Sequence, residues 1–163
     1  MTNPRICFGL QYNCCFPIRN SEPEVGAMGM DLTGLKPTAE IGVYFRNPDV
    51  CWSPLWDYVA STCSDILTRT DVKLGSFNMG HRISRAKALR ISERLQTELK
   101  SGSTAKYSSR IRKRLSKPRP RTAAQVALMV ASALNVNSRV RFNVSNVRKF
   151  AEFCGASGGF VID

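Results

Sequence analysis

The sequence is poor in the residues that metal centres and histidine-dependent active sites require. His81 is its only histidine, and none of its six cysteines belongs to a C-x-x-C pair. Zinc sites usually combine such pairs or a set of Cys and His ligands, so no metal site is predicted. A serine or cysteine nucleophile activated by histidine would have to use His81. The sequence therefore predicts no metal, no cofactor and no catalytic residue.

Long apolar runs are absent as well. No stretch approaches the roughly 18 consecutive apolar residues that a membrane-spanning helix needs. Residues 1–5 are not followed by the apolar core and the small-residue cleavage site of a secretion signal. We therefore expect a cytoplasmic protein that has no membrane partner.

Reduced cysteines are the expectation for such a compartment. Cys63 and Cys154 fall on apolar faces of predicted helices, where a thiol packs as a small apolar side chain. The alternative is a cluster in the folded protein. Its members would be Cys7, Cys14, Cys15 and Cys51.

Acidic residues are missing from most of the last third of the chain. Residues 100–151 hold thirteen of the 24 Lys and Arg residues and no Asp or Glu, whereas residues 1–99 hold eleven Lys and Arg against ten acids. The net charge of +12 therefore comes almost entirely from the last third. Because like charges repel and oppose folding, a block of one sign is kept for a polyanion more often than for stability.

One α+β domain over residues 1–163 is predicted, mainly helical and with a small sheet. The hydrophobic fraction of 43% is ample for a core. Apolar runs at residues 6–10 and 158–162 predict two strands, and we expect them to pair and to bring the ends of the chain together. Residues 13–38 are interrupted by prolines and glycines, which predicts a long loop.

Capping residues and helical spacing of apolar residues predict four helices after that loop. Their first signals are Ser53, Ser84, Thr122 and Ser145. The second helix is expected over residues 85–100 and the third over residues 122–134, and Gly155 is expected to end the last one. Residues 140–142 are predicted to form a brief strand.

Residues 101–121 are predicted to form a basic, flexible insertion between the second and third helices. A short helix is compatible with residues 110–114, and Pro118 would end it. Lys and Arg side chains neutralise phosphates and release counterions, which gives affinity without reading a base sequence. The alternatives are a solvated linker and a surface for an acidic protein partner. The candidate nucleic-acid-binding residues are Lys106, Arg110, Arg112, Lys113, Arg114, Lys117, Arg119 and Arg121.

His81 follows a glycine in a turn-rich connector. We expect its side chain to satisfy local backbone groups at the start of the second helix. The alternative is an enzyme centred on His81, in which Cys51, Cys63 or an acidic residue completes the site.

Several short motifs are distributed along the chain, and together they form a recognisable set. The first pair is Trp52-Ser-Pro-Leu-Trp-Asp-Tyr-Val59 and Phe77-Asn-x-Gly80-His-Arg-Ile-Ser84. The second pair is Asn146-Val-Arg-Lys-Phe-Ala-Glu-Phe153 and Ser157-Gly-Gly-Phe160. Asp31-Leu-Thr-Gly-Leu35 belongs to the set too.

This set resembles a family of uncharacterised small proteins of bacteria and their phages, over about half of the chain. Similar proteins often carry paired C-x-x-C-x-G-x-G elements that resemble a zinc-binding insertion. Here the corresponding stretch is the cysteine-free basic insertion. The resemblance therefore implies a shared scaffold with an exchangeable insert, and it implies neither a zinc site nor an activity.

These observations predict a small, non-enzymatic binding protein whose basic surface engages nucleic acid, DNA or RNA, through phosphates. The alternative is a phage or anti-phage interaction protein that inhibits or modulates a nucleic-acid machine such as a defence complex. It would present the basic surface to an acidic or nucleic-acid-bearing protein. An enzyme around His81 is the third hypothesis. The sequence leaves the oligomeric state open.

Overall fold

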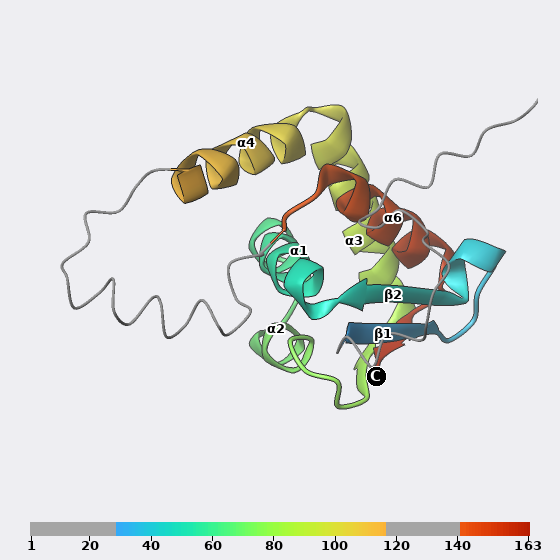
Figure 1. Ribbon diagram of the computed structural model, residues 1–163. Coiled ribbons are helices and arrows are strands. Elements are labelled where there is room, and N and C mark those ends of the chain that lie inside the picture. Colours follow the sequence, from blue (N-terminus) through green and yellow to red (C-terminus); the bar gives the residue numbers. More distant parts are fainter. Residues whose placement is uncertain (1–28, 117–140) are drawn as a thin grey trace, which may run out of the picture.

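The structure is a computed structural model, and it describes residues 29–116 and 141–163. Within these ranges four antiparallel strands form one sheet in the spatial order β2-β1-β4-β3. Helices α1, α3 and α6 lie on one side of that sheet (Figure 1). The predicted α+β fold, with a small sheet that joins early and late parts of the chain, is confirmed.

The elements follow one another in a simple order along the chain. The strands are β1 (Gly29–Gly34), β2 (Tyr44–Pro48), β3 (His81–Ile83) and β4 (Phe160–Ile162). The helices are the short 3-10 turn η1 (Glu40–Gly42), α1 (Asp49–Thr62), α2 (Arg69–Leu74), α3 (Arg85–Lys100), α4 (Ser103–Ser116) and α6 (Val144–Ala156).

Strand β1 corrects the predicted loop over residues 13–38. Met30 and Leu32 are buried, whereas Asp31 is half-buried and Thr33 is exposed. This alternation turns one face of the strand to the core. The loop prediction was wrong at residues 29–34, because glycines at both strand ends resemble breaks and the apolar alternation spans only two residues. Residues 13–28 lie outside the described ranges.

Strand β4 confirms the predicted closing strand. It pairs with β1 on one side, where Leu32 lies opposite Ile162, and with β3 on the other, where Ile83 lies opposite Phe160. The partner predicted for it, residues 6–10, lies outside the described ranges. β4 therefore occupies a central position in the sheet between strands from two other parts of the chain.

Helix α1 begins at Asp49, four residues before the predicted cap Ser53, and it contains Pro54 in its interior. A proline has no N–H to donate to the carbonyl four residues earlier, which here is Val50. The backbone N–H of Arg141 donates to that carbonyl instead, at 3.0 Å. A contact from a distant segment thus satisfies the acceptor that Pro54 leaves open, and the helix continues through the proline.

The predicted helix over residues 85–100 is confirmed as α3, with Ser84 as its N-cap. Helix α6 is capped by Asn143, whose Oδ1 accepts the N–H of Ser145 at 2.8 Å. Ser145 thus lies inside the helix instead of capping it, and the helix ends at Ala156, one residue after the predicted Gly155. The predicted third helix lies outside the described ranges, and residues 141–142 are not part of a strand.

Two tryptophans fasten α2 to α1. The rings of Trp52 and Trp56 stack with their centroids 5.3 Å apart. Trp52 Nε1 donates to the carbonyl of Gly75 and Trp56 Nε1 to the carbonyl of Val72, both at 3.0 Å. Both indole N–H groups are therefore satisfied in the core. They hold in place a helix of six residues, which is too short to be stable alone.

Candidate nucleic-acid interface

The basic insertion contains a regular helix, α4, which only two residues separate from α3. One of them, Gly102, has a φ of +74°, a conformation that glycine adopts without strain. The prediction of a flexible insertion over residues 101–121 is therefore corrected for Ser103–Ser116. Regular helix suits this stretch because Lys, Arg and Ser at its surface are compatible with helical backbone and because its inner face packs on the core.

Aromatic side chains hold α4 against the domain. The hydroxyls of Tyr58 and Thr104 lie 2.9 Å apart and share a hydrogen bond in the buried interior. The ring of Tyr107 lies 4.8 Å from that of Tyr58 and 4.9 Å from that of Phe142, between centroids. Tyr58 comes from α1 and Phe142 precedes α6, so α4 is docked on two other parts of the fold. The contacts of Thr104 and Tyr107 on the inner face of α4 therefore fix the direction in which its outer face points.

The cations of α4 divide between two sides of the helix. At about 100° per residue, Lys106, Arg110 and Lys113 fall within an arc of about 60°, and Arg114 lies next to that arc. We call these four residues the α4 stripe. All four are exposed. Arg112 is exposed too, but it lies about 100° away from Lys113 on the opposite flank.

The stripe lies on the flank of α4 that carries Tyr107. The guanidinium carbon of Arg110 lies 5.8 Å from the centroid of the Tyr107 ring, within cation–π range. This contact restricts Arg110 without consuming its N–H donors. It thus leaves a planar group oriented for bidentate contact with a phosphate.

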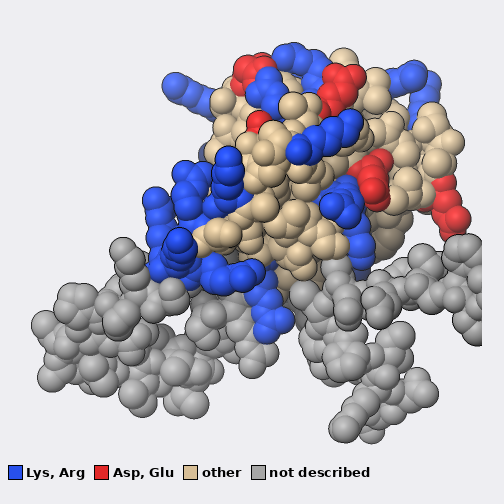
Figure 2. Space-filling view, turned by 90° about the horizontal axis from the view of Figure 1, so that it is seen from above, with Lys and Arg blue, Asp and Glu red and all other residues tan. Residues whose placement is uncertain are grey.

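Two carboxylates of the domain form ion pairs with cations outside the stripe. Asp65 lies 3.4 Å from Arg90 and 3.0 Å from Arg94, and Asp31 lies 3.8 Å from Arg46. Figure 2 shows Lys and Arg side chains gathered at the end of the molecule that α4 forms, with no acidic side chain among them. On the rest of that face the two signs are interspersed. The domain therefore presents one end of strong positive potential.

The structure brings together four of the eight candidate residues. Arg112 shares their helix but not their face. The remaining three candidates, Lys117, Arg119 and Arg121, lie outside the described ranges. The basic run in the sequence did not distinguish Arg112 from the neighbouring cations. Once the stretch is known to be helical, the rotation of about 100° per residue places Arg112 on a different side of the helix.

His81 makes a contact that the sequence did not predict. Its Nε2 lies 3.0 Å from Oδ1 of Asp71, and Nζ of Lys87 donates to Oδ2 of the same carboxylate at 2.5 Å. The predicted role in satisfying local backbone groups is therefore wrong, because the side chain reaches a carboxylate on α2. The signal for Asp71 was the sequence Thr68-x-x-Asp71, which forms a capping box at the start of α2.

Asp71 is buried and has partners from three elements. Burial raises the pKa of its carboxyl, but the hydrogen bonds from Lys87, Thr68 and His81 outweigh that effect and leave the pKa well below its usual range. The carboxylate thus ties α2, β3 and α3 together. This arrangement suits a structural crosslink, and the enzyme hypothesis stays a prediction without further support.

Burial makes the thiols of Cys63 and Cys154 poor nucleophiles, because desolvation raises the pKa of both. Cys51, Cys63 and Cys154 are buried, and Cys63 and Cys154 are free thiols. Desolvation raises the pKa of Cys63 to about 11, so its thiol is protonated at neutral pH. Among residues 29–116 and 141–163 no three His, Cys, Asp or Glu side chains gather as a metal site would require. Cys7, Cys14 and Cys15 lie outside those ranges.

Comparisons with models of known protein families, with curated proteins and with solved structures found no match to this chain. The resemblance to the bacterial and phage family therefore remains a prediction based on short motifs. In the part of the chain that the structure describes, no helix has the length and apolar character that crossing a bilayer demands.

Proposed function

We propose that this protein binds nucleic acid through the α4 stripe, chiefly by contacts with phosphates. The observation that carries the proposal is the placement of four exposed cations on one side of a helix whose inner face is docked by Thr104 and Tyr107. Each cation that meets a phosphate releases condensed counterions, and that release is favourable at low salt.

Docking makes the stripe more effective than a flexible arm with the same charge. Lys106 and Arg114 are separated by eight residues, so the stripe extends about 12 Å along the helix axis. Its cations are already aligned before binding, and less conformational entropy is lost when a phosphate backbone is engaged. Arg110 and Arg114 add bidentate contacts, and the lysines act as point charges.

The experiment compares two alanine variants of the same helix, Arg110→Ala and Arg112→Ala. Both remove one positive charge and both introduce the best helix former, so neither is expected to melt α4. Binding of labelled DNA and RNA is measured by fluorescence anisotropy over a series of salt concentrations. Arg110→Ala should reduce the slope of log affinity against log salt by about 0.7 to 0.9, while Arg112→Ala should leave it nearly unchanged.

Lys106→Ala and Lys113→Ala should act as Arg110→Ala does, with equal effects on probes of different sequence. A wild-type affinity that does not depend on salt would contradict the proposal. So would equal effects of Arg110→Ala and Arg112→Ala, because the stripe would then have no special role.

The second candidate is a phage or anti-phage interaction protein that presents the same stripe to an acidic or nucleic-acid-bearing protein. The phage-like motifs in α1, α6 and β4 favour it, together with the acid-free end of the molecule in Figure 2. Affinity purification after nuclease treatment tests this candidate. One stoichiometric partner that is lost with Arg110→Ala would support it over direct nucleic-acid binding.

A further inference from the structure

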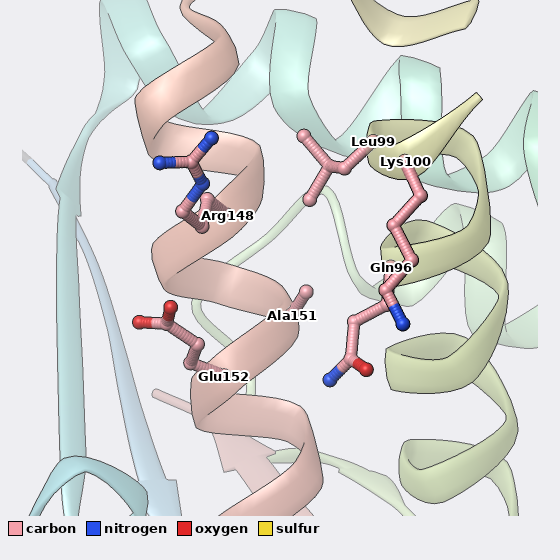
Figure 3. Close-up of a pocket in the computed structure, with 6 residues that line it drawn as sticks. All are labelled: Gln96, Leu99, Lys100, Arg148, Ala151 and Glu152. Carbon is pink, nitrogen blue, oxygen red and sulfur yellow. The ribbon is translucent and has the colours of Figure 1, made fainter. Parts of the chain in front are cut away.

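An open groove lies between α3 and α6, with a volume of about 330 Å³ (Figure 3). Its walls combine two cations, a carboxylate, an amide and two apolar side chains. From α3 come Gln96, Leu99 and Lys100, and from α6 come Arg148, Ala151 and Glu152. A volume near the lower end of ligand sites, about 300 Å³, suits a group the size of one nucleotide better than a long segment.

Close helix packing forms the floor of this groove. Ser92 Oγ of α3 donates to the carbonyl of Ala151 in α6 at 2.7 Å, and both residues are buried. Gln96 Nε2 in turn donates to Ser92 Oγ at 3.2 Å. Because its amide nitrogen is held toward the floor, the carboxamide of Gln96 has a preferred orientation, as a recognition group needs.

Charged groups line the groove without neutralising one another. Lys100, Arg148 and Glu152 are exposed. None of the salt bridges found between residues of the two described ranges involves them. Figure 3 shows the cationic side chains on opposite walls, with the Glu152 carboxylate below Arg148 on the α6 wall. The groove therefore offers cations for an anion and a separate acceptor for an N–H donor.

The groove borders the helix that carries the stripe. Lys100 is the last residue of α3, and only two residues separate it from α4. On the other wall, α6 is capped by Asn143, directly after Phe142, and Phe142 packs against Tyr107 on the stripe's flank of α4. A strand of nucleic acid that follows the stripe can thus reach the groove.

We propose that this groove binds one nucleotide of a single-stranded nucleic acid, a proposal that rests on the proposed function of α4. Lys100 and Arg148 hold its phosphate, and the base lies against the half-buried Leu99. The carboxylate of Glu152 on the α6 wall accepts a hydrogen bond from an exocyclic amino group, and the carboxamide of Gln96 lies on the facing α3 wall. Cytosine has such an amino group, whereas thymine and uracil present carbonyl oxygens there. The groove therefore favours cytosine over thymine and uracil.

Oligo-dC and oligo-dT of about ten nucleotides test the inference, because both are pyrimidine strands of matched length and charge. Anisotropy at one fixed salt concentration should show oligo-dC bound about fivefold more tightly by the wild type. Glu152→Ala should abolish this preference by weakening oligo-dC relative to oligo-dT. Gln96→Ala should reduce the preference. Both residues are exposed helix positions where alanine preserves the fold.

Glu93→Ala is the matched control, since it removes an exposed acid from α3 outside the groove. It should change both affinities by the same factor and keep the preference. If Glu152→Ala does the same, its carboxylate acts only through long-range charge and the inference is overturned. A double-stranded probe should show no effect of Glu152→Ala beyond that of Glu93→Ala, because paired bases cannot enter the groove.

Competition experiments with free CMP and UMP test whether the groove also binds a free nucleotide or only a nucleotide within a strand. Competition by CMP, lost in Glu152→Ala and unchanged in Arg110→Ala, supports the same base chemistry for a free nucleotide. Equal binding of oligo-dC and oligo-dT by the wild type, with the salt slope still sensitive to Arg110→Ala, overturns the groove and leaves the α4 proposal standing. Absence of binding to every nucleic acid, with binding of a poly-glutamate probe, overturns both.

Discussion

The backbone N–H of Arg141 donates to the carbonyl oxygen of Val50 across 3.0 Å. Pro54 lies four residues after Val50 and has no N–H to offer to that oxygen. This hydrogen bond between distant segments therefore satisfies the carbonyl that Pro54 leaves without an intrahelical donor, and it holds the chain against α1 just before Phe142. Phe142 in turn packs on Tyr107 of α4, so the same segment contacts both α1 and α4.

Protection of the Arg141 amide from hydrogen exchange is the first prediction. A residue outside regular secondary structure normally exchanges rapidly, but the bond to Val50 should slow exchange at Arg141. Pro54→Ala supplies a competing N–H and should lower that protection while α1 stays helical. NMR hydrogen exchange on wild type and variant measures both effects. Rapid exchange of Arg141 in the wild type would contradict the proposed repair.

Loss of stability at low pH is expected from Asp71. Its pKa is lower in the folded state than in the unfolded state, where it is about 3.9. The carboxylate therefore stabilises the fold above that value, and the contribution is lost as the pH falls below it toward the folded pKa. Asp71→Asn should lower the free energy of unfolding by about 2 kcal/mol at pH 7 and flatten its decline in acid.

Asp65→Asn is the comparison for this prediction, because the Asp65 side chain is 50% exposed and that of Asp71 is 6% exposed. Solvent screens the exposed pair, so a loss below about 0.5 kcal/mol is expected. Urea unfolding of both variants at several pH values provides the measurement. Equal losses at pH 7 would show that Asp71 is not a structural crosslink.

Detaching α4 from the domain should weaken the binding of nucleic acid, although the charge of α4 does not change. Tyr107→Ala removes the ring that contacts Tyr58 and Phe142, and all four cations of the α4 stripe remain. We expect a loss of affinity for nucleic acid of about fivefold, because the helix must be ordered on binding. Circular dichroism should show less helix in the free variant.

Phe77→Ala serves as the control for α4 docking, since Phe77 is 51% exposed in the connector before β3. Its helix content and affinity should match those of the wild type. Unchanged affinity of Tyr107→Ala would mean that the stripe acts by charge alone, without its docked geometry.

Two glycines with positive φ should differ in their tolerance of alanine. Gly80 has a φ of +71°, and a methyl group added there would meet no atom within 4 Å, so Gly80→Ala should cost about 1 kcal/mol of stability. Gly158 has a φ of +65°, and its Cβ would lie 2.1 Å from the Lys36 carbonyl. Gly158→Ala should therefore destabilise the fold by clearly more than Gly80→Ala in urea unfolding. Similar losses would contradict the tight contact after α6.

Local signals in the chain were sufficient for some elements. The serine cap and the apolar spacing predicted α3 at its observed bounds, since a long amphipathic helix contains many mutually consistent signals. β1 and the start of α1 were missed. Glycines flank the two inward residues of β1, and Pro54 resembles a first-turn residue until the donor from Arg141 is known.

For the candidate site, the charge block was visible in the sequence, but its geometry was not. The separation of Arg112 from Lys106, Arg110 and Lys113 depends on a helical backbone, and the helix depends on Tyr58 and Phe142 from elsewhere in the chain. The groove was invisible because Gln96 and Glu152 lie on helices distant in sequence. Asp71 was missed for the same reason, because its partners His81 and Lys87 are on other elements.

By itself the sequence determined the α+β character of the fold, the position of α3 and the concentration of positive charge in the last third of the chain. These properties depend on composition and on residues close together along the backbone. Only the tertiary structure decided which cations share a face, which strand accompanies β4 and which side chains meet between α3 and α6. Those outcomes depend on packing between distant segments, whose free energy no local pattern contains.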